Sequence, residues 1–337
     1  MNKKTFIIAE LSANHGHDIE IAKETVRAAK RAGADAVKLQ TYTAETITFD
    51  GKQDHFKISH GTHWDGQYLY DLYQDASLPW EWHAALFETA KEEGLVCFSS
   101  PFDFTAVDFL EELNCPIYKI ASFEITDIPL IEYIASKGKP VIISTGIADI
   151  EDIKLAIETC KKTGNNDITI LKCTSAYPAS PEDANLLTIP DIVERFGVKS
   201  GLSDHTLGVE APMVAVALGA KVIEKHFILD KKIGGADAHF SLDENEFKHM
   251  VDSIRLTEKL MGRIDYDMTE KKKKSREFSR SLFVVKDVVK GDIITKENMR
   301  SIRPGYGLHP KFYNEILGKK FLQNIEKGTP INKEHFD

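Results

Sequence analysis

Short runs of apolar residues recur at regular spacing along the first 262 residues and alternate with longer amphipathic stretches. The short runs are almost continuously apolar, as strands are when both faces of a parallel sheet are covered. In longer stretches such as 19–33, 80–94, 149–164 and 247–262, apolar residues repeat with the period of a helix. The pattern predicts eight strands that alternate with helices, at 5–11, 36–42, 96–101, 117–122, 140–146, 168–175, 199–205 and 222–227.

Glycine marks the predicted ends of several helices, because a helix commonly stops at a residue with a left-handed backbone. The glycines at these places are Gly33, Gly94, Gly138, Gly164 and Gly262. Eight strand–helix units predict an α/β fold, a closed (β/α)8 TIM barrel, over residues 1–264. A doubly wound sheet that binds a dinucleotide is disfavoured, because the turn at 10–15 contains no GxGxxG motif.

One connection, 43–79, is much longer than the others and lies between the second strand and its helix. Loops of this length in a compact domain are usually functional or disordered. This one is too aromatic for a solvated linker, so we expect it to cover an active site. Its aromatic and histidine residues include His55, His60, His63, Trp64, Tyr68, Tyr70 and Tyr73.

The composition changes after Gly262. Residues 265–280 carry four consecutive lysines and few apolar side chains, which predicts a solvated linker, and 281–337 contains short β segments separated by turns. From Asp265 onward there are 16 Lys and Arg against 11 Asp and Glu, so the tail carries +5 and residues 1–264 carry −14. A small basic domain beside an acidic one suggests that the tail docks on another barrel or brings a cation to an anionic substrate.

Composition excludes several functional classes. A net charge of −9 gives no general positive field for a nucleic acid. No apolar stretch approaches the roughly 20 residues that span a bilayer, and the N-terminal residues do not resemble a signal peptide. The four cysteines have no CxxC spacing, and three lie in apolar runs. We therefore expect a cytoplasmic protein with buried, reduced thiols.

Polar residues gather at the predicted C-terminal ends of the strands, where TIM barrels carry their functional side chains. Burying so many polar groups in one mouth is unfavourable unless a ligand or mutual pairing satisfies them. We therefore expect an active site there. The residues are Glu10, Asn14, His15, Lys38, Gln40, Ser99, Ser100, Lys119, Ser122, Glu124, Ser144, Thr145, Thr174, Ser175, Tyr177, Ser203, Asp204, His205, Glu224, Lys225 and His226.

Two histidines, His205 and His226, end neighbouring strands and are predicted to face each other. A single histidine is more often structural, but a matched pair favours a divalent first-row metal whose open positions take water or substrate. Asp204 and Glu224 are expected to orient the two rings from behind.

Lys38 and Lys119 are poor core residues, because a buried ammonium group needs an anionic partner. Three interpretations stay open: a structural ion pair with Glu10 or Glu124, a cationic cradle for a phosphate and a carboxylate, or a lysine that forms a Schiff base as in an aldolase. Serines 100, 122, 144 and 203 would complete a phosphate cup as neutral donors.

The motifs AELSANHGH, VKLQTYT, CFSSPF, YKIASFE, IISTGIA, KCTSAYP, GLSDHTLG and VIEKHF occur in the order found in the sialic acid synthase family, which this chain resembles over nearly its whole length. The segment SIRPGYGLHPKF resembles that family's antifreeze-like (SAF) domain. The resemblance implies a metal-dependent condensation of phosphoenolpyruvate with the open-chain aldehyde of an N-acetylated amino sugar, with release of phosphate by C–O cleavage. The metal would be manganese, or else magnesium or cobalt.

Within the family, AELSANH, KIASFE and the GLHP turn resemble members that use 2,4-diacetamido-2,4,6-trideoxy-L-altrose. Synthases of legionaminic or N-acetylneuraminic acid, which are the alternatives, more often have EIGxNH. A 6-deoxy sugar implies an apolar pocket, to which Phe123 would contribute, although an aromatic after a strand is more often part of the core. The tail's antifreeze-like sequence also raises ice or carbohydrate binding, but the polar ring disfavours a pure binding module.

The resemblance also implies roles for individual residues. Arg303 would reach the sugar's acetamido group from the tail of a partner chain, in a domain-swapped homodimer. Two features depart from the family: Ser175 stands where Asn is common, and GGADAHFSL replaces a GPD-type turn, which leaves the partners of Asp237 open. The implied roles are His205 and His226 for the metal; Lys38, Ser100, Lys119, Ser122, Ser144, Ser175 and Ser203 for phosphoenolpyruvate; Gln40 and Tyr177 for the sugar; and Glu10, Glu124 and Asp237 for acid–base catalysis.

Overall fold

The computed structural model describes residues 4–59 and 64–337, which form two compact units, Met1–Gly262 and Arg263–Asp337. In the first unit eight parallel strands close into a barrel, in which each strand pairs with the next and β8 pairs with β1. The predicted closed barrel is confirmed. The strands are β1 (Phe6–Glu10), β2 (Ala36–Thr41), β3 (Val96–Pro101), β4 (Tyr118–Ile120), β5 (Val141–Ser144), β6 (Ile168–Cys173), β7 (Lys199–Asp204) and β8 (Val222–His226).

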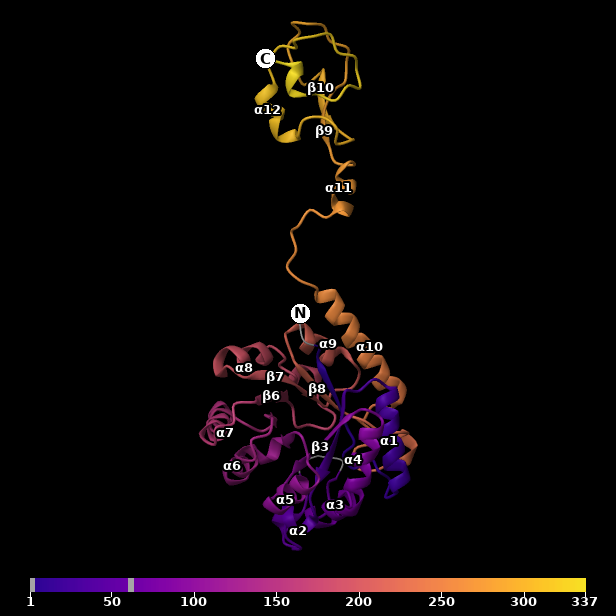
Figure 1. The fold of residues 1–337 in the computed structure, drawn as a ribbon, viewed down its shortest axis with the longest axis vertical. Helices are drawn as coiled ribbons and strands as arrows, with labels where there is room; N and C mark the ends of the chain where they lie inside the picture. The colour runs from indigo at the N-terminus through magenta and orange to yellow at the C-terminus, as the bar shows by residue number, and fades with distance from the viewer. Residues whose placement is uncertain (1–3, 60–63) are drawn as a thin grey trace. The chain divides into compact units, whose positions relative to one another are not determined.

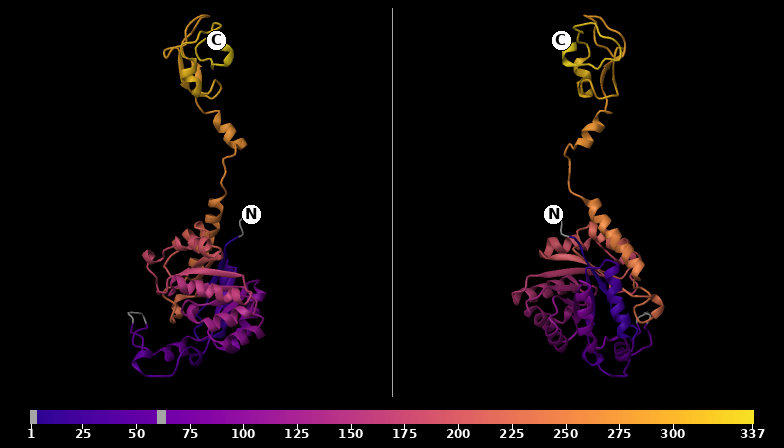
Figure 2. Two further views of the ribbon diagram at one scale, coloured as in Figure 1. Left: turned by 90° about the vertical axis from the view of Figure 1, so that its left-hand side faces the viewer. Right: turned by 45° about the vertical axis from the view of Figure 1, so that its right-hand side comes forward.

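Helices surround the barrel on its outside, as Figures 1 and 2 show. Aspartates begin several of them: the Asp18 side chain accepts from Glu20 N, and Asp243 forms a capping box with Glu246. The five glycines predicted at helix ends all have positive φ. The helices are α1 (Ile19–Arg31), α4 (His83–Glu92), α5 (Phe104–Glu112), α6 (Ile128–Ser136), α7 (Ile150–Lys162), α8 (Thr188–Phe196), α9 (Glu210–Ala217) and α10 (Glu244–Met261).

Alternation along the strands divides the barrel's side chains between two environments. Ile7 and Ala9 of β1 belong to one buried apolar cluster with Val26 and Ala29 of α1, so they face the helices. Glu10 therefore faces the interior. Its partner in the parallel register is His226, the last residue of β8. The closed sheet thus brings the two ends of the barrel sequence together at one mouth.

Segment 43–79 contains α2 (Ala44–Ile47), the 3-10 turn Asp54–Phe56 and α3 (Leu69–Ala76), and it leads through Trp80–Trp82 into α4. Aromatic contacts fix it to the barrel. The ring of Tyr73 meets that of Tyr42 with centroids 6.0 Å apart, and Trp80 Nε1 donates to the carbonyl of Tyr42 at 3.1 Å. His60 and His63 of this segment lie outside the described residues.

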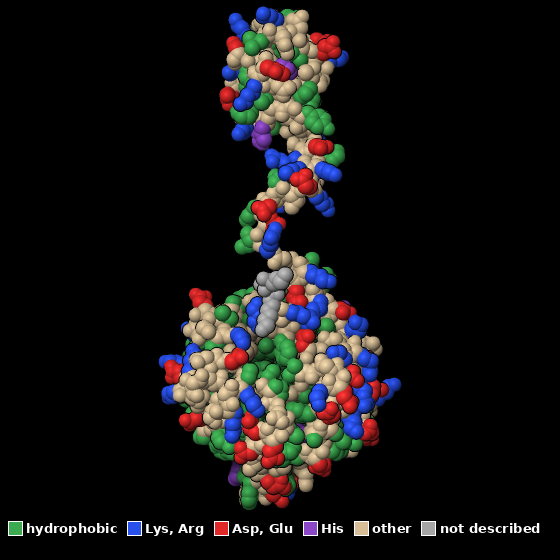
Figure 3. Space-filling model, in the orientation of Figure 1, with side chains coloured by type: hydrophobic (Ala, Val, Ile, Leu, Met, Phe, Trp, Pro, Cys, Tyr) green, Lys and Arg blue, Asp and Glu red, His purple; other side chains and the backbone are tan. Residues whose placement is uncertain are grey.

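The second unit has its own apolar core, which includes Leu282, Val284, Met299 and Phe321. Strands β9 (Ser281–Val284) and β10 (Met299–Ile302) pair antiparallel, and a short helix, α12 (Tyr313–Ile316), follows. Residues 265–280 were predicted to be a linker. They contain helix α11 (Glu270–Arg276), whose residues are all exposed and whose Lys and Arg side chains are visible in Figure 3.

All four cysteines are buried and free, as expected for thiols in apolar surroundings. Among the described residues, no helix combines the length and the apolar character needed to cross a bilayer.

Candidate active site

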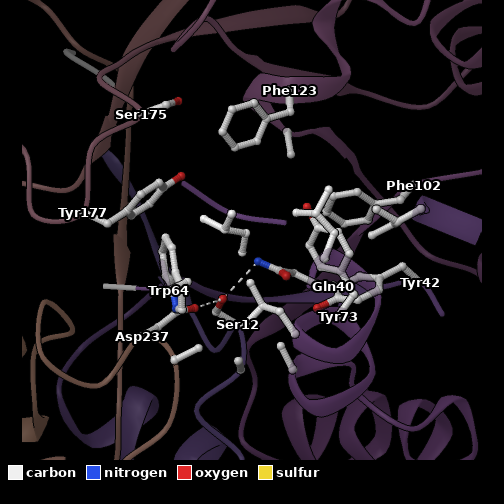
Figure 4. A pocket seen from close by; sticks show the side chains of 18 of the residues that line it. Ser12, Gln40, Tyr42, Trp64, Tyr73, Phe102, Phe123, Ser175, Tyr177 and Asp237 are labelled. Atoms are coloured by element: carbon white, nitrogen blue, oxygen red, sulfur yellow. Dashed lines mark hydrogen bonds between the residues drawn. The ribbon is translucent and has the colours of Figure 1, made fainter. Parts of the chain in front are cut away.

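A cavity of about 410 Å³ opens at the C-terminal ends of the strands. Figure 4 shows Ser175, Tyr177 and Asp237 on one side of this cavity and the rings of Tyr42, Tyr73 and Phe102 on the opposite side. Segment 43–79 supplies much of the apolar wall, in agreement with the expected cover. The lining residues are Ser12, Ala13, Gln40, Tyr42, Ile47, His55, Lys57, Ile58, Trp64, Leu69, Leu72, Tyr73, Ala76, Phe102, Ala121, Ser122, Phe123, Glu124, Ser175, Tyr177, His226, Ala236 and Asp237.

A buried ion pair connects β1 and β2 inside the barrel. Lys38 Nζ lies 2.7 Å from Glu10 Oε2, and both side chains are almost completely buried. Lys38 also donates to Ser100 Oγ at 3.3 Å. Of the two carboxylate partners considered from the sequence, Glu10 is the one within ion-pair distance, so the structural pairing of Lys38 is present.

Glu224 lies between the two lysines. Its carboxylate oxygens are 3.8 Å from Lys38 Nζ and 3.9 Å from Lys119 Nζ, and Ser203 Oγ donates to Oε1 at 2.8 Å. The lysines of β2 and β4 therefore converge on one carboxylate of β8. The sequence could have predicted that Glu224 faces the site, because Glu224 and His226 are two residues apart on a strand and share a face.

Burial and the neighbouring charges shift the pKa values of the groups in this cluster. Burial raises the pKa of Glu10 to about 7, although Lys38 acts in the opposite direction. Burial also disfavours ionisation of Glu224, but Lys119 and Lys38 outweigh it and lower its pKa. Burial lowers the pKa of Lys119. When Glu10 binds a proton, the two lysines face a single carboxylate, which leaves a net positive charge suited to an anion.

His205 and His226 lie side by side, with ring centroids 5.3 Å apart. His205 Nδ1 is 2.9 Å from the carbonyl oxygen of Thr174, a contact that places a proton on Nδ1 and leaves Nε2 as an acceptor. His226 Nδ1 is buried without a hydrogen-bond partner among the described residues, and burial holds the pKa of this ring well below its usual value. The expected pairing of the histidines is confirmed.

The donor set fits a divalent first-row cation. Two imidazoles side by side suit such a metal, and an orphaned buried ring nitrogen is unfavourable without a ligand. Within 4–59 and 64–337, no group of three or more His, Cys, Asp or Glu side chains is arranged to hold a metal ion. Further ligands would therefore come from water or substrate.

The expectation that Asp204 orients a histidine ring is wrong, and the recorded contacts of Glu224 are with Ser203, Lys38 and Lys119. Asp204 points to the opposite side of β7 from His205, and its carboxylate pairs with Lys225 Nζ at 2.5 Å. Both side chains of this pair are nearly inaccessible to solvent. Neighbouring residues on a strand face opposite sides of the sheet. Asp204 therefore points away from the adjacent His205, whose ring it was expected to orient.

Glu124 presents a carboxyl group to the cavity from the turn after β4. Its Oε2 is buried and has no hydrogen-bond partner within the described part of the chain. Burial raises its pKa to about 7, against the opposing influence of Lys119. A carboxyl group that binds its proton near neutral pH is suited to donate it to a substrate.

This pKa predicts how stability depends on pH. The folded pKa of Glu124 lies above its usual value of 4.5, so the stabilising contribution is complete below 4.5 and is lost as pH rises through 7. Relative to Glu124→Gln, the wild-type free energy of unfolding should decrease by at most about 3 kcal/mol across this range. Urea titrations of both proteins at several pH values measure this difference in the free energy of unfolding. Glu112→Gln, on an exposed part of α5, should leave the pH dependence unchanged.

Tyr177 and Asp237 complete the part of the wall near the histidines. The Tyr177 ring centroid is 4.4 Å from that of His205, and Asp237 Oδ2 is 3.6 Å from His226 Nδ1. The partners of Asp237, left open by the sequence, include the hydroxyl of Ser12. Sequence reasoning missed Ser12, although its position two residues after β1 was a usable signal.

The structure brings nearly all predicted site residues to one mouth. Phe123 lines the cavity and is 58% exposed, so it does not belong to the core. Ser122 and Ser175 contact each other through their hydroxyls at 2.6 Å. Arg303 belongs to the second unit, where it lies in a shallow basic hollow with residues of α11.

Comparison with known proteins gives consistent matches to the two units. Residues 25–266 match the NeuB family, and residues 279–337 match the SAF domain. A pseudaminic acid synthase of Campylobacter jejuni is 50% identical over 335 residues, which cover 99% of this chain and 97% of that protein. A pseudaminic acid synthase of Helicobacter pylori is 51% identical over 332 residues, 98% of this chain and 97% of that one.

A solved structure has the same architecture. The N-acetylneuraminic acid synthetase of Leptospira borgpetersenii, in complex with citrate, aligns with a TM-score of 0.72 and 31% identity over 81% of this chain and 90% of that one. The family match covers most of the barrel, and the two bacterial relatives extend through both units. The chain therefore belongs to the NeuB family.

Proposed function

We propose that the protein condenses phosphoenolpyruvate with 2,4-diacetamido-2,4,6-trideoxy-L-altrose to give pseudaminic acid and phosphate. One observation carries the chemistry: two lysines converge on Glu224 while two imidazoles lie side by side at the same barrel mouth. Such a site accommodates a doubly anionic substrate and a cation next to each other. The 50% identity to pseudaminic acid synthases over nearly the whole chain supports the choice of reaction.

Phosphoenolpyruvate would bind at the buried polar end of the site. Lys38 and Lys119 supply the positive charge for its phosphate and carboxylate groups, and hydroxyl groups supply neutral hydrogen bonds. Ser144 Oγ supports this placement, because it is buried without a hydrogen-bond partner in the described residues. The other contributing hydroxyls are those of Ser100, Ser122, Ser175 and Ser203.

His205 and His226 would hold a divalent cation, for which we propose manganese. When bound, the cation supplies Lewis acidity for the sugar's aldehyde group. The protein's own contribution is to fix the His205 ring and to keep His226 neutral. The contact of His205 Nδ1 with Thr174 fixes one ring, and burial keeps His226 unprotonated.

The bond changes can be assigned to protein groups. Carbon 3 of phosphoenolpyruvate forms a bond to the aldehyde carbon, and the aldehyde oxygen takes the proton of Glu124. Water then adds to carbon 2 and gives its proton to Glu10, whose pKa of about 7 suits a base near neutral pH. The bond between carbon 2 and the bridging oxygen then breaks, and phosphate leaves with that oxygen and the bonding electron pair. The phosphate takes the proton of the new hydroxyl group as carbon 2 becomes a carbonyl.

The apolar wall favours a 6-deoxy sugar. Tyr42, Phe102 and Phe123 line the side of the cavity away from Asp237, as Figure 4 shows. A methyl group gains from burial against such a wall, whereas the terminal hydroxyls of N-acetylmannosamine would lose hydrogen bonds to water there.

Turnover with candidate sugars tests this function. The protein, a divalent metal and phosphoenolpyruvate are incubated with the diacetamido-altrose, with the sugar precursor of legionaminic acid, or with N-acetylmannosamine, and phosphate release is followed. The altrose derivative should be used best. Equal or better turnover with either alternative would overturn the substrate assignment. Phosphoenolpyruvate labelled with 18O at the bridging position should pass its label to phosphate.

We also propose that Arg303 serves the active site of a partner chain in a homodimer. The opposite net charges of the tail and the barrel support this arrangement. Arg303→Ala should raise the sugar KM about tenfold or more, whereas Arg300→Ala, on the same unit, should not.

Mixing two impaired chains, assayed at a sugar concentration well below the wild-type KM, gives a sharper test of this arrangement. Chains carrying Arg303→Ala and chains carrying His226→Ala are co-expressed, so that mixed dimers form. In a swapped dimer one site of each mixed pair has an intact barrel and an intact arginine, and activity should return. Absence of recovery in verified mixed dimers would contradict the exchange.

A further inference from the structure

Ser12 occupies a backbone conformation that serine rarely adopts. It lies two residues after the end of β1 and has φ of 47°, in the left-handed region that favours glycine. The residue is also buried, with 7% of its surface exposed. A strained residue at a site persists when surrounding interactions hold it there, and none of the roles assigned so far uses this side chain.

The Ser12 hydroxyl joins two cavity residues that come from distant parts of the chain. It donates to Asp237 Oδ2 and accepts from Gln40 Nε2 at 3.0 Å. Figure 4 shows both contacts as dashed lines. A hydroxyl has one proton, so donation to the carboxylate leaves its oxygen to accept from the amide.

These contacts fix the orientation of the Gln40 amide. Gln40 Nε2 donates to Ser12 and also to Glu10 Oε1 at 2.8 Å, which uses both amide protons. No donor among the described residues is recorded within hydrogen-bond distance of Gln40 Oε1. The amide therefore offers an acceptor, not a donor, to a ligand in the cavity that it lines.

The carboxylate of Asp237 needs an external anchor. It lies in a loop just after Gly234 and Gly235, whose φ values are 75° and 109°. Two successive glycines restrict the backbone little, so the loop alone does not fix the side chain. The Ser12 hydroxyl holds the Asp237 carboxylate from the loop that follows the neighbouring strand β1, although the two residues are 225 positions apart in the sequence.

We infer that Ser12 is a positioning residue that fixes the Gln40 amide and the Asp237 carboxylate as paired acceptors for the N–H and O–H donors of the sugar. This inference rests on the proposed function. Phosphoenolpyruvate has few hydrogen-bond donors and would bind near the lysines. Ser12 should therefore affect the binding of the sugar and not that of phosphoenolpyruvate.

Glycine and alanine at this position separate positioning from stability. Ser12→Gly removes the hydroxyl and relieves the backbone strain, whereas Ser12→Ala removes the hydroxyl and keeps the strain. Both variants should raise the sugar KM by about tenfold to a hundredfold, with the phosphoenolpyruvate KM within about twofold of wild type. The melting temperature of Ser12→Gly should equal or exceed that of Ser12→Ala.

Asn114→Gly is the matched control. Asn114 also has a left-handed backbone, with φ of 56°, but it is exposed after α5 and is remote from the cavity lining. Its replacement relieves the same kind of strain and should change neither KM. In a Gln40→Ala, Asp237→Asn background, loss of the Ser12 hydroxyl should have little further effect on the sugar KM.

The outcomes distinguish this inference from the proposed function. Wild-type turnover of the diacetamido-altrose together with unchanged kinetics of Ser12→Gly would overturn the role of Ser12 alone. Equal increases in both KM values would show a general disturbance and would also overturn it. Failure of the wild-type protein to release phosphate with this sugar would overturn the proposed function, and the inference about Ser12 with it.

Discussion

Replacement of Lys38 by methionine is expected to abolish phosphate release and to lower the free energy of unfolding by about 3–5 kcal/mol. Lys38 Nζ lies 2.7 Å from Glu10 and 3.8 Å from Glu224, and all three side chains are buried. Its removal leaves two buried carboxylates facing each other. Urea denaturation measures the stability, and a phosphate assay at saturating substrate measures the turnover.

A second variant separates the two effects. Lys38→Met combined with Glu10→Gln removes one of the unpaired charges and should recover much of the lost stability, but not activity. Wild-type stability of the single variant would contradict the buried pairing. Glu10 and Glu224 outweigh burial and raise the pKa of Lys38, which favours an ammonium ion over a free amine. Borohydride reduction with substrate should therefore attach no mass to Lys38. The proposed condensation forms no Schiff base on Lys119 either, so an adduct on one of the two lysines would favour the Schiff-base aldolase.

Loss of His226 should have an equally large effect by a different route. His226→Ala is expected to reduce turnover by roughly a thousandfold or more and to abolish tight Mn²⁺ binding. His226 Nδ1 has no hydrogen-bond partner in the described residues, and the centroid of its ring lies 5.3 Å from that of His205. Electron paramagnetic resonance of free Mn²⁺ measures binding without reference to catalysis.

The metal prediction has its own controls. His205→Ala should behave like His226→Ala, whereas His249→Ala, on the exposed side of α10, should bind Mn²⁺ as the wild-type protein does. EDTA should inactivate the wild-type enzyme, and added Mn²⁺ should restore it. Full activity of the chelated enzyme would exclude the proposed metal role.

The residue pattern was sufficient to predict the architecture and the location of the site. Eight nearly continuous apolar runs predicted eight strands covered on both sides, and β1 to β8 occupy those runs. Local patterns predict such elements well, because hydrophobic periodicity and helix-ending glycines act within a few residues. The polar residues at strand ends were likewise placed correctly, because parallel strands of a barrel end at one mouth.

The sequence did not decide which of these polar residues face one another. His205 lies against the rings of Tyr177 and His226, which line the cavity, whereas the adjacent Asp204 pairs with Lys225. The shared role of Glu224 and the bridge from Ser12 to Asp237 also depend on chain closure. Local sequence thus determined which residues reach the mouth of the barrel. The register of the closed sheet decided their partners, because hydrogen bonds and ion pairs form only between groups a few ångströms apart, whatever their separation along the chain.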